Sequence, residues 1–146
     1  MKTKKLISKL FFTTLLINSV AMAEPAKPLS SDIPLGIFNI KPGEELNLPL
    51  DKLYVGVKYE VICTIQYQNQ SNEEYSHIAL SCPANGIIWR DGDRLGTCSA
   101  NNVISYKTKG SRLTISEIHN YSQVAIRNLD YTDATSANCI AAIDAI

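Results

Sequence analysis

The chain has 146 residues, with 14 Lys and Arg, 14 Asp and Glu, and a formal net charge of zero. This length fits one domain with an adequate hydrophobic core. The lack of a basic surplus argues against a general nucleic-acid binder, so we expect no nucleic-acid partner.

Residues 1–23 have the composition of a secretory signal peptide. Lysines come first, an apolar run follows, and the small residues Ala21 and Ala23 mark a cleavage site. The apolar run is shorter than the roughly 20 residues that span a bilayer, so we expect cleavage after Ala23 and no membrane span afterwards. The segment holds four of the 14 basic residues and no acidic one, which leaves 10 against 14 and a formal charge of −4. We therefore predict a periplasmic or secreted protein.

The mature chain is predicted to have a flexible leader and one domain. Residues 24–31 are rich in Pro, Ser and Ala and form the leader, and residues 32–146 form the domain. Two runs with alternating apolar residues follow, and each contains a proline that withholds a backbone donor, so both are predicted to be edge strands. Their apolar positions are Ile33, Leu35 and Ile37, then Leu46, Leu48 and Leu50.

Residues 59–67 are predicted to form the central, half-buried strand, because apolar and mainly polar residues alternate along them. Immediately upstream, the pattern Leu53-x-x-Gly56-x-x-Tyr59 resembles the tyrosine corner of Greek-key β-sandwiches. In that motif a glycine allows a tight crossover and the tyrosine hydroxyl bonds back to the upstream backbone. The resemblance implies a sandwich architecture and indicates no function.

Short predicted strands recur along the rest of the chain. A polar loop covers residues 68–74, and strands are expected at 77–82, 87–89, 93–98, 103–108, 112–118 and 123–129. This spacing is typical of a sandwich or barrel. Residues 135–146 fit either a strand or a short C-terminal helix. We therefore predict an all-β, disulfide-bonded, Greek-key-like β-sandwich.

An even number of cysteines in an exported chain predicts two disulfides in an oxidising compartment. The four are Cys63, Cys82, Cys98 and Cys139, and three pairings are open from the sequence alone. We favour Cys82 with Cys98, which closes a local hairpin, and Cys63 with Cys139, which ties the central strand to the last element. The alternative, a zinc site, is disfavoured because the chain has no C-x-x-C pair.

The sequence predicts no catalytic, cofactor or metal site. His77 and His119 are accompanied by no nucleophile-elbow motif, and no methionine remains after cleavage to complete a blue-copper set. The aspartates at 91 and 93 flank a glycine, which is more typical of a hairpin tip than of a calcium loop. A small secreted hydrolase is a minor alternative.

A binding surface is the preferred interpretation. The expected partner-binding residues lie around a hairpin tip inside the loop that Cys82 and Cys98 would close: Trp89, Arg90, Asp91, Asp93 and Arg94. Trp and Arg are favoured interface anchors, and a stapled hairpin loses little entropy on binding. The competing interpretation is that Trp89 packs in the core.

A second group of charged residues could meet an acidic partner or simply be solvated. Lys107, Lys109 and Arg112 cluster at what we predict to be another hairpin.

Two binding hypotheses therefore precede the hydrolase. The first is a non-catalytic module that binds a protein partner in the cell envelope or extracellular space. The second is a structural subunit of a surface assembly that pairs through edge strands, with Ile33, Leu35 and Ile37 on a donated strand. The oligomeric state stays open.

Overall fold

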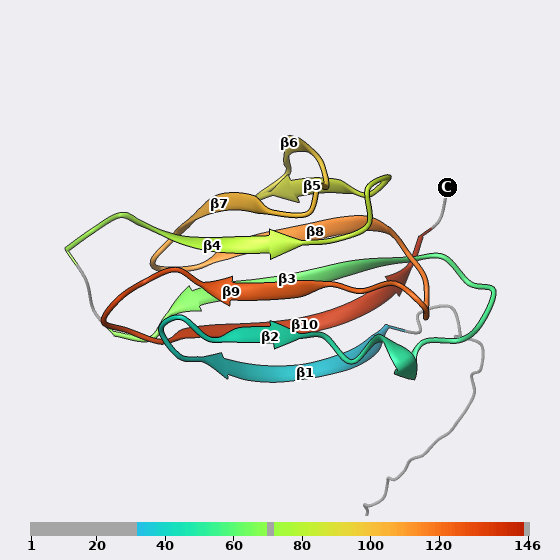
Figure 1. The fold of residues 1–146 in the computed structure, drawn as a ribbon, viewed down its shortest axis with the longest axis horizontal. Helices are drawn as coiled ribbons and strands as arrows, with labels where there is room; N and C mark the ends of the chain where they lie inside the picture. The colour runs from blue at the N-terminus through green and yellow to red at the C-terminus, as the bar shows by residue number, and fades with distance from the viewer. Residues whose placement is uncertain (1–31, 70–71, 145–146) are drawn as a thin grey trace, which may run out of the picture. The chain divides into compact units, whose positions relative to one another are not determined.

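The computed structural model describes residues 32–69 and 72–144, which form a sandwich of two antiparallel sheets (Figure 1). The signal-peptide and leader predictions, on residues 1–31, lie outside the described residues. The fold class predicted from the sequence is confirmed. The elements are β1 (Ile33–Ile40), β2 (Glu45–Asn47), the 3-10 turn η3 (Leu50–Lys52), β3 (Tyr59–Tyr67), β4 (Tyr75–Ser81), β5 (Ile87–Arg90), β6 (Asp93–Thr97), β7 (Asn102–Lys107), β8 (Ser111–Ile118), β9 (Ala125–Asn128) and β10 (Thr135–Ile143).

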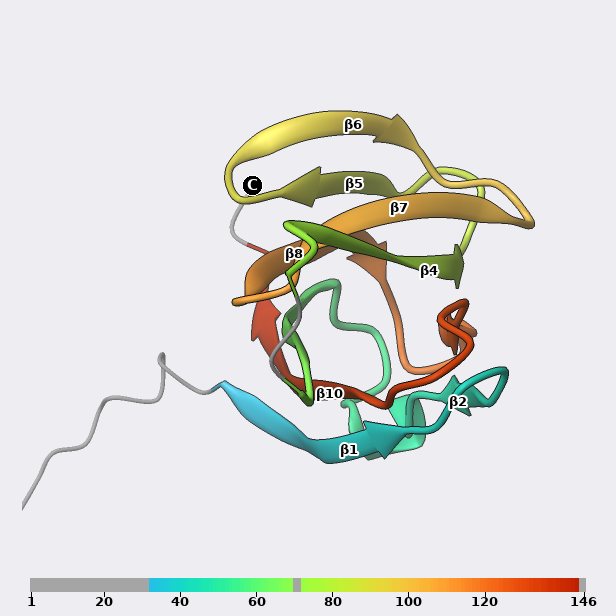
Figure 2. The same ribbon diagram turned by 90° about the vertical axis from the view of Figure 1, so that its left-hand side faces the viewer.

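The chain passes from one sheet to the other at almost every connection. The larger sheet has the order β1-β10-β3-β8-β5-β6, and the smaller has the order β2-β9-β4-β7. Within the described chain, β5 and β6 are the only consecutive strands that share a sheet. Strands β1 and β6 are therefore the two edges of the larger sheet, at opposite sides of the molecule in Figure 2.

The core lies between the two sheets and is built by alternation along the strands. On β3, the inward positions Tyr59, Val61, Cys63 and Ile65 are buried, as the sequence pattern predicts. The smaller sheet contributes Ile78, Leu80, Ile104, Tyr106 and Ile126 from the other side. Together these faces form one continuous hydrophobic core.

The tyrosine-corner pattern adopts the geometry that its resemblance implies. The Tyr59 hydroxyl is buried and accepts a hydrogen bond from the Tyr54 backbone N–H at 3.1 Å. Gly56, in the turn between them, has a φ of +81°, in the left-handed region that glycine enters most easily. This hydrogen bond fixes the crossover that leads from the smaller sheet into β3.

The sequence pattern placed Ile33, Leu35 and Ile37 on one face of β1, and the structure agrees with this only in part. Leu35 points into the core, but Ile37 is exposed, and Phe38 and Ile40 pack inward in its place. The pairing of β1 with β10 shifts register between Pro34 and Gly36, which marks a β-bulge. An extra residue in one strand reverses the inward and outward alternation beyond it.

The C-terminal segment is a strand and not a helix, at least as far as Ile143. β10 lies between β1 and β3 and pairs with both. Its inward residues Ala137, Cys139 and Ala141 are fully buried. Pairing on both sides satisfies its backbone groups, which outweighs the helix propensity of an alanine-rich segment.

Both favoured disulfide pairings are present. Cys63 and Cys139 lie directly opposite each other on β3 and β10, with Cα atoms 4.1 Å apart. Cys82, which directly follows β4, and Cys98, which directly follows β6, are joined with a Cα separation of 5.6 Å. Two buried disulfides are characteristic of an oxidising, exported environment. In the described ranges, no helix is long and apolar enough to cross a membrane.

Candidate functional site

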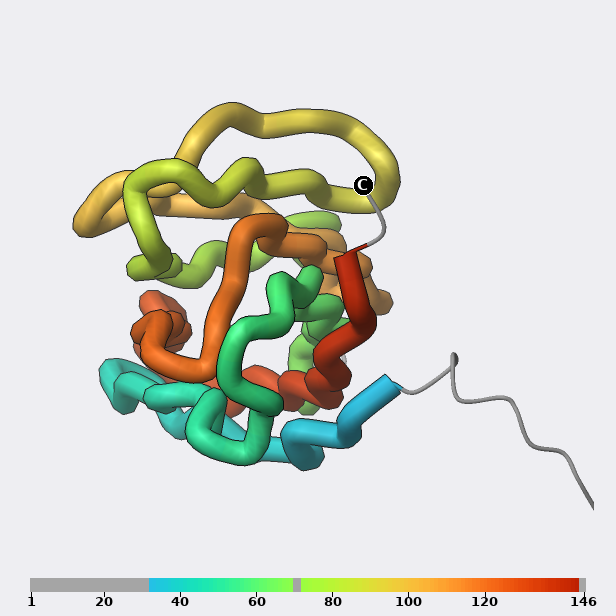
Figure 3. Tube along the Cα trace, turned by 90° about the vertical axis from the view of Figure 1, so that its right-hand side faces the viewer, coloured from blue at the N-terminus to red at the C-terminus, as the bar shows by residue number. Residues whose placement is uncertain are grey.

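The predicted Asp91-Gly92 hairpin tip is confirmed. Arg90 pairs with Asp93 across a two-residue turn, and both turn residues have positive φ, 51° at Asp91 and 88° at Gly92. Positive φ at both central residues is the signature of a turn that matches the twist of paired strands. The hairpin forms one edge of the larger sheet, at the top of the molecule in Figure 3, with β1 at the opposite edge.

Two of the predicted partner-binding residues hold the hairpin onto the rest of the domain. The Arg90 guanidinium donates to the backbone carbonyl of Ser105 at 3.0 Å and to its hydroxyl at 2.9 Å. Ser105 belongs to β7, so this contact joins the two sheets. The Asp91 carboxylate accepts from the Arg112 N–H at 2.8 Å, and the Asp91 N–H donates to the Arg112 carbonyl at 2.8 Å.

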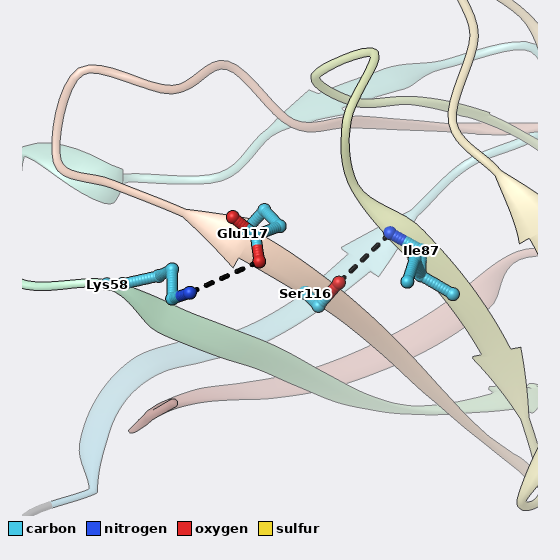
Figure 4. A network of polar contacts seen from close by, with 4 residues as sticks. All are labelled: Lys58, Ile87, Ser116 and Glu117. Atoms are coloured by element: carbon cyan, nitrogen blue, oxygen red, sulfur yellow. Dashed lines mark hydrogen bonds and ion pairs between the residues drawn. The ribbon is translucent and has the colours of Figure 1, made fainter. Parts of the chain in front are cut away.

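The base of the hairpin is also closely packed. The Ser116 hydroxyl accepts a hydrogen bond from the Ile87 N–H at 3.0 Å, next to an ion pair of 3.3 Å between Lys58 and Glu117 (Figure 4). A Cβ placed on Gly86 would lie only 3.0 Å from the Ser116 carbonyl oxygen and 3.2 Å from the Cys98 sulfur. The disulfide, the hydroxyl and the glycine together fix where β5 starts.

The remaining hairpin residues are open to solvent. Asp93, Arg94 and Leu95 are exposed along β6, and no strand lies beyond β6 among the described residues. Leu95 was not predicted from the sequence, although its place close to the predicted hairpin tip is a signal that could have found it. A protruding edge strand thus carries two opposite charges and one apolar side chain.

Trp89 is half-buried and outside the apolar core, since its neighbour Ile88 supplies the inward side chain. The registers place Trp89 in one row across the larger sheet with Thr114, Ile62 and Ile140. All four are partly exposed. The row gives the outer face of the larger sheet a mainly apolar strip, which begins beside β6 and crosses β5, β8, β3 and β10.

The other charged cluster is arranged differently from the prediction. Residues 107–111 do not close a hairpin, because β7 pairs with β4, whereas β8 pairs with β3 and β5. The turn signal was correct, but the turn carries the chain between sheets. Lys107, Lys109 and Arg112 are all exposed.

The two histidines lie in different settings. His77 is exposed on β4 of the smaller sheet. His119 lies in the turn after β8, where its ring stacks on Tyr121 with centroids 5.1 Å apart, and its backbone N–H donates to the Ser122 hydroxyl. In the part of the chain that the structure describes, no three His, Cys, Asp or Glu side chains are grouped to hold a metal.

A polar network where β4 begins and β7 ends was not predicted from the sequence. The buried Tyr106 hydroxyl is hydrogen-bonded to Thr135, and Ser76 donates to the Asp130 carboxylate at 3.2 Å. Burial raises the pKa of Tyr106, although its hydrogen bonds to Thr135 and Ser76 oppose this effect. The sequence signal was the segment from Asp130 to Asp133, whose acidic and hydroxyl residues favour a side-chain-bonded turn.

The fold and these sites define an exported-type, two-disulfide β-sandwich with a fixed, protruding hairpin. No protein-family model, curated protein or solved structure matches the chain. Any functional proposal therefore rests on the geometry of the described residues.

Proposed function

We propose that the protein is a non-catalytic binding module that acts in the cell envelope or extracellular space, and that it binds a protein partner through the β5–β6 hairpin. The observation that carries this proposal is the combination of a fixed base and an open edge. The Cys82–Cys98 disulfide and the hydrogen bonds of Arg90 and Asp91 hold the hairpin. Its outer strand β6 is exposed.

A fixed hairpin favours binding because little conformational entropy is lost when a partner docks. An edge strand offers unpaired backbone groups, and a partner segment in extended conformation can pair with them. Asp93, Arg94 and Leu95 would then set specificity, because their side chains flank the added strand. Trp89 adds apolar contact from the neighbouring strand, where it pairs with Arg94.

In this proposal the five residues selected from the sequence divide into two roles. Trp89, Asp93 and Arg94 contact the partner, whereas Arg90 and Asp91 position the hairpin. Substituting Arg90 would therefore test the stability of the hairpin as much as its binding.

The test compares matched changes on two edge strands. Leu95→Asp alters β6, where Leu95 is 42% exposed, and Val103→Asp alters β7, an edge of the other sheet, where Val103 is 63% exposed. The oxidised parent and both variants are used to capture partners from envelope and secreted extracts. We expect a partner that binds the parent and Val103→Asp but not Leu95→Asp.

A partner that binds both variants equally would remove the hairpin from the proposal. The structural-subunit alternative predicts instead that the purified protein forms stable oligomers, which size-exclusion chromatography measures directly. In this structure β1 is paired with β10, and Leu35 is buried in its own core. Donation of β1 to a neighbour would therefore require that strand to detach first.

A further inference from the structure

A second surface feature lies where β3 ends, β4 begins and β9 connects to β10. These segments meet at the left-hand end of the sandwich in Figure 1. A cavity of about 420 Å³ opens there, and its lining includes Asp130 and the three tyrosines Tyr67, Tyr75 and Tyr131. Glu73 and His77 also line it.

The carboxylate of Asp130 is held in place by neutral donors. One oxygen, Oδ1, accepts from the Thr132 N–H at 2.8 Å, the Thr132 hydroxyl at 3.1 Å and the Asp133 N–H at 3.1 Å. The other, Oδ2, accepts from the Ser76 hydroxyl at 3.2 Å. The position of the carboxylate is therefore fixed by its own loop and by β4.

These hydrogen bonds favour the charged form of the Asp130 carboxylate, and none of the donors carries a positive charge. Burial would raise the pKa of Asp130, but the hydrogen bonds from Thr132, Asp133 and Ser76 outweigh burial and lower the pKa. Neither of the two ion pairs found in the described part of the chain involves Asp130. A negative charge is thus held beside the cavity with no cation paired to it.

The occupied lone pairs of Asp130 also limit what it can bind. A carboxylate offers about four acceptor positions, and these four hydrogen bonds use most of them. A hydroxyl-rich ligand such as a sugar would find little free acceptor capacity. A quaternary ammonium has no N–H to donate, so its attraction to the carboxylate depends on charge and distance and not on a free lone pair.

The tyrosine rings supply the second component of a site for a cation. The faces of aromatic rings carry negative potential and attract ammonium and guanidinium groups. Tyr131 is 95% exposed, so its ring can close over a ligand without leaving any packed contact. A neighbouring hollow, also lined by Tyr67 and Tyr75, contains two lysines, at 107 and 109, beside two glutamates, at 73 and 74. Among the described residues that line the Asp130 cavity there is no lysine or arginine.

We infer that the cavity lined by Asp130, Tyr67, Tyr75 and Tyr131 is a binding site for an alkylammonium group. The group would rest against the tyrosine rings and next to the Asp130 carboxylate. It could belong to a free quaternary ammonium compound or to a lysine side chain of a peptide. This site is separate from the β5–β6 hairpin, and neither proposal depends on the other.

The test uses NMR titration of the oxidised protein with choline, with its neutral isostere 3,3-dimethyl-1-butanol and with a blocked lysine peptide. We expect choline to bind and the neutral isostere to bind far more weakly, with shifts at the backbone amides of residues 130–133. Stronger binding of the peptide than of choline would assign the site to a lysine side chain. The reverse would assign it to a free quaternary ammonium.

Variants locate the site. Tyr131→Ala should weaken choline binding about fivefold, the magnitude expected for one exposed ring. Tyr121→Ala is the matched control, because Tyr121 is 78% exposed in a different turn, and it should leave binding unchanged. Asp130→Asn should weaken binding about tenfold if the charge is the main attraction.

Equal binding of choline and its neutral isostere, or no binding of any cation, would overturn the inference. Equal weakening by Tyr131→Ala and Tyr121→Ala would do the same. A methyl glycoside that binds more tightly than every cation would show that the cavity recognises a sugar and not an ammonium group. Because Tyr131 is so exposed, its variant remains informative even if Asp130→Asn fails to fold.

Discussion

Removing the two disulfides one at a time should destabilise the domain to different degrees. The two double variants are Cys63→Ala with Cys139→Ala, and Cys82→Ala with Cys98→Ala. All four cysteines are buried, so each pair loses similar packing when its sulfur atoms are removed. The main difference is the length of chain that each bond closes, which is 76 residues for the first pair and 16 for the second.

A cross-link stabilises the fold mainly by restricting the unfolded chain, and the restriction grows with loop length. The chain-entropy relation gives about 4.5 kcal/mol for a separation of 76 residues and about 3 kcal/mol for a separation of 16. Loss of the Cys63–Cys139 bond should therefore cost about 1.5 kcal/mol more of the free energy of unfolding. A domain of this size typically has only about 5–15 kcal/mol in total.

Urea unfolding of the parent and both double variants, followed by tryptophan fluorescence and circular dichroism, gives the three free energies. We expect the lowest midpoint for the variant that lacks Cys63 and Cys139. Equal losses, or a larger loss on removing Cys82 and Cys98, would refute the loop-entropy reasoning. The second of these results would indicate that fixing the β5–β6 hairpin is the larger contribution to stability.

Three further predictions concern single side chains. Tyr59→Phe should cost about 1 kcal/mol in urea unfolding, because it removes only the hydrogen bond to the Tyr54 N–H, whereas Tyr121→Phe should cost nothing measurable. Asn128→Asp should cost about 2–4 kcal/mol, since the buried Asn128 amide donates to two carbonyls and a carboxylate cannot; an unchanged midpoint would contradict this. Because the folded pKa of Asp130 is lowered, its stabilisation is present above the unfolded pKa and is lost as the pH falls through the folded pKa. Asp130→Asn should therefore destabilise clearly near neutral pH and progressively less below about pH 4, as thermal unfolding across the acid range would show.

Short-range sequence patterns predicted where the strands are, but they did not predict which strands pair with each other. The alternation along residues 59–67, the Asp91-Gly92 turn and the tyrosine corner each depend on a few neighbouring residues, and each was recognised. Sheet membership depends on contacts between distant residues, which is why the turn at 107–111 was taken for a hairpin although its strands lie in different sheets. The bulge in β1 was missed for a related reason, because it is defined by the register with β10.

The candidate sites show the same difference: features set by neighbouring residues were predicted, and contacts between distant residues were not. Trp89 and its neighbours were recognised from residue type and turn signal. The internal hydrogen bonds of Arg90 could not be predicted, because they reach Ser105 in the other sheet. The Asp130 cavity was missed entirely, since its lining comes from segments as far apart as Tyr67 and Tyr131.

The position of β10 between β1 and β3 has a consequence for how the chain can fold. The last strand completes the middle of the larger sheet, so neither β1 nor β3 has its full set of partners until residues 135–143 are available. Strand pairings between such distant segments form slowly. The entropy cost of closing the long intervening loop comes before the contacts between the strands can stabilise it. A chain that stops before Thr135 would hold Cys63 without its partner and leave two strand edges open to aggregation. Folding of this domain is therefore expected to follow synthesis of residues 135–143, with formation of the Cys63–Cys139 bond as a late step.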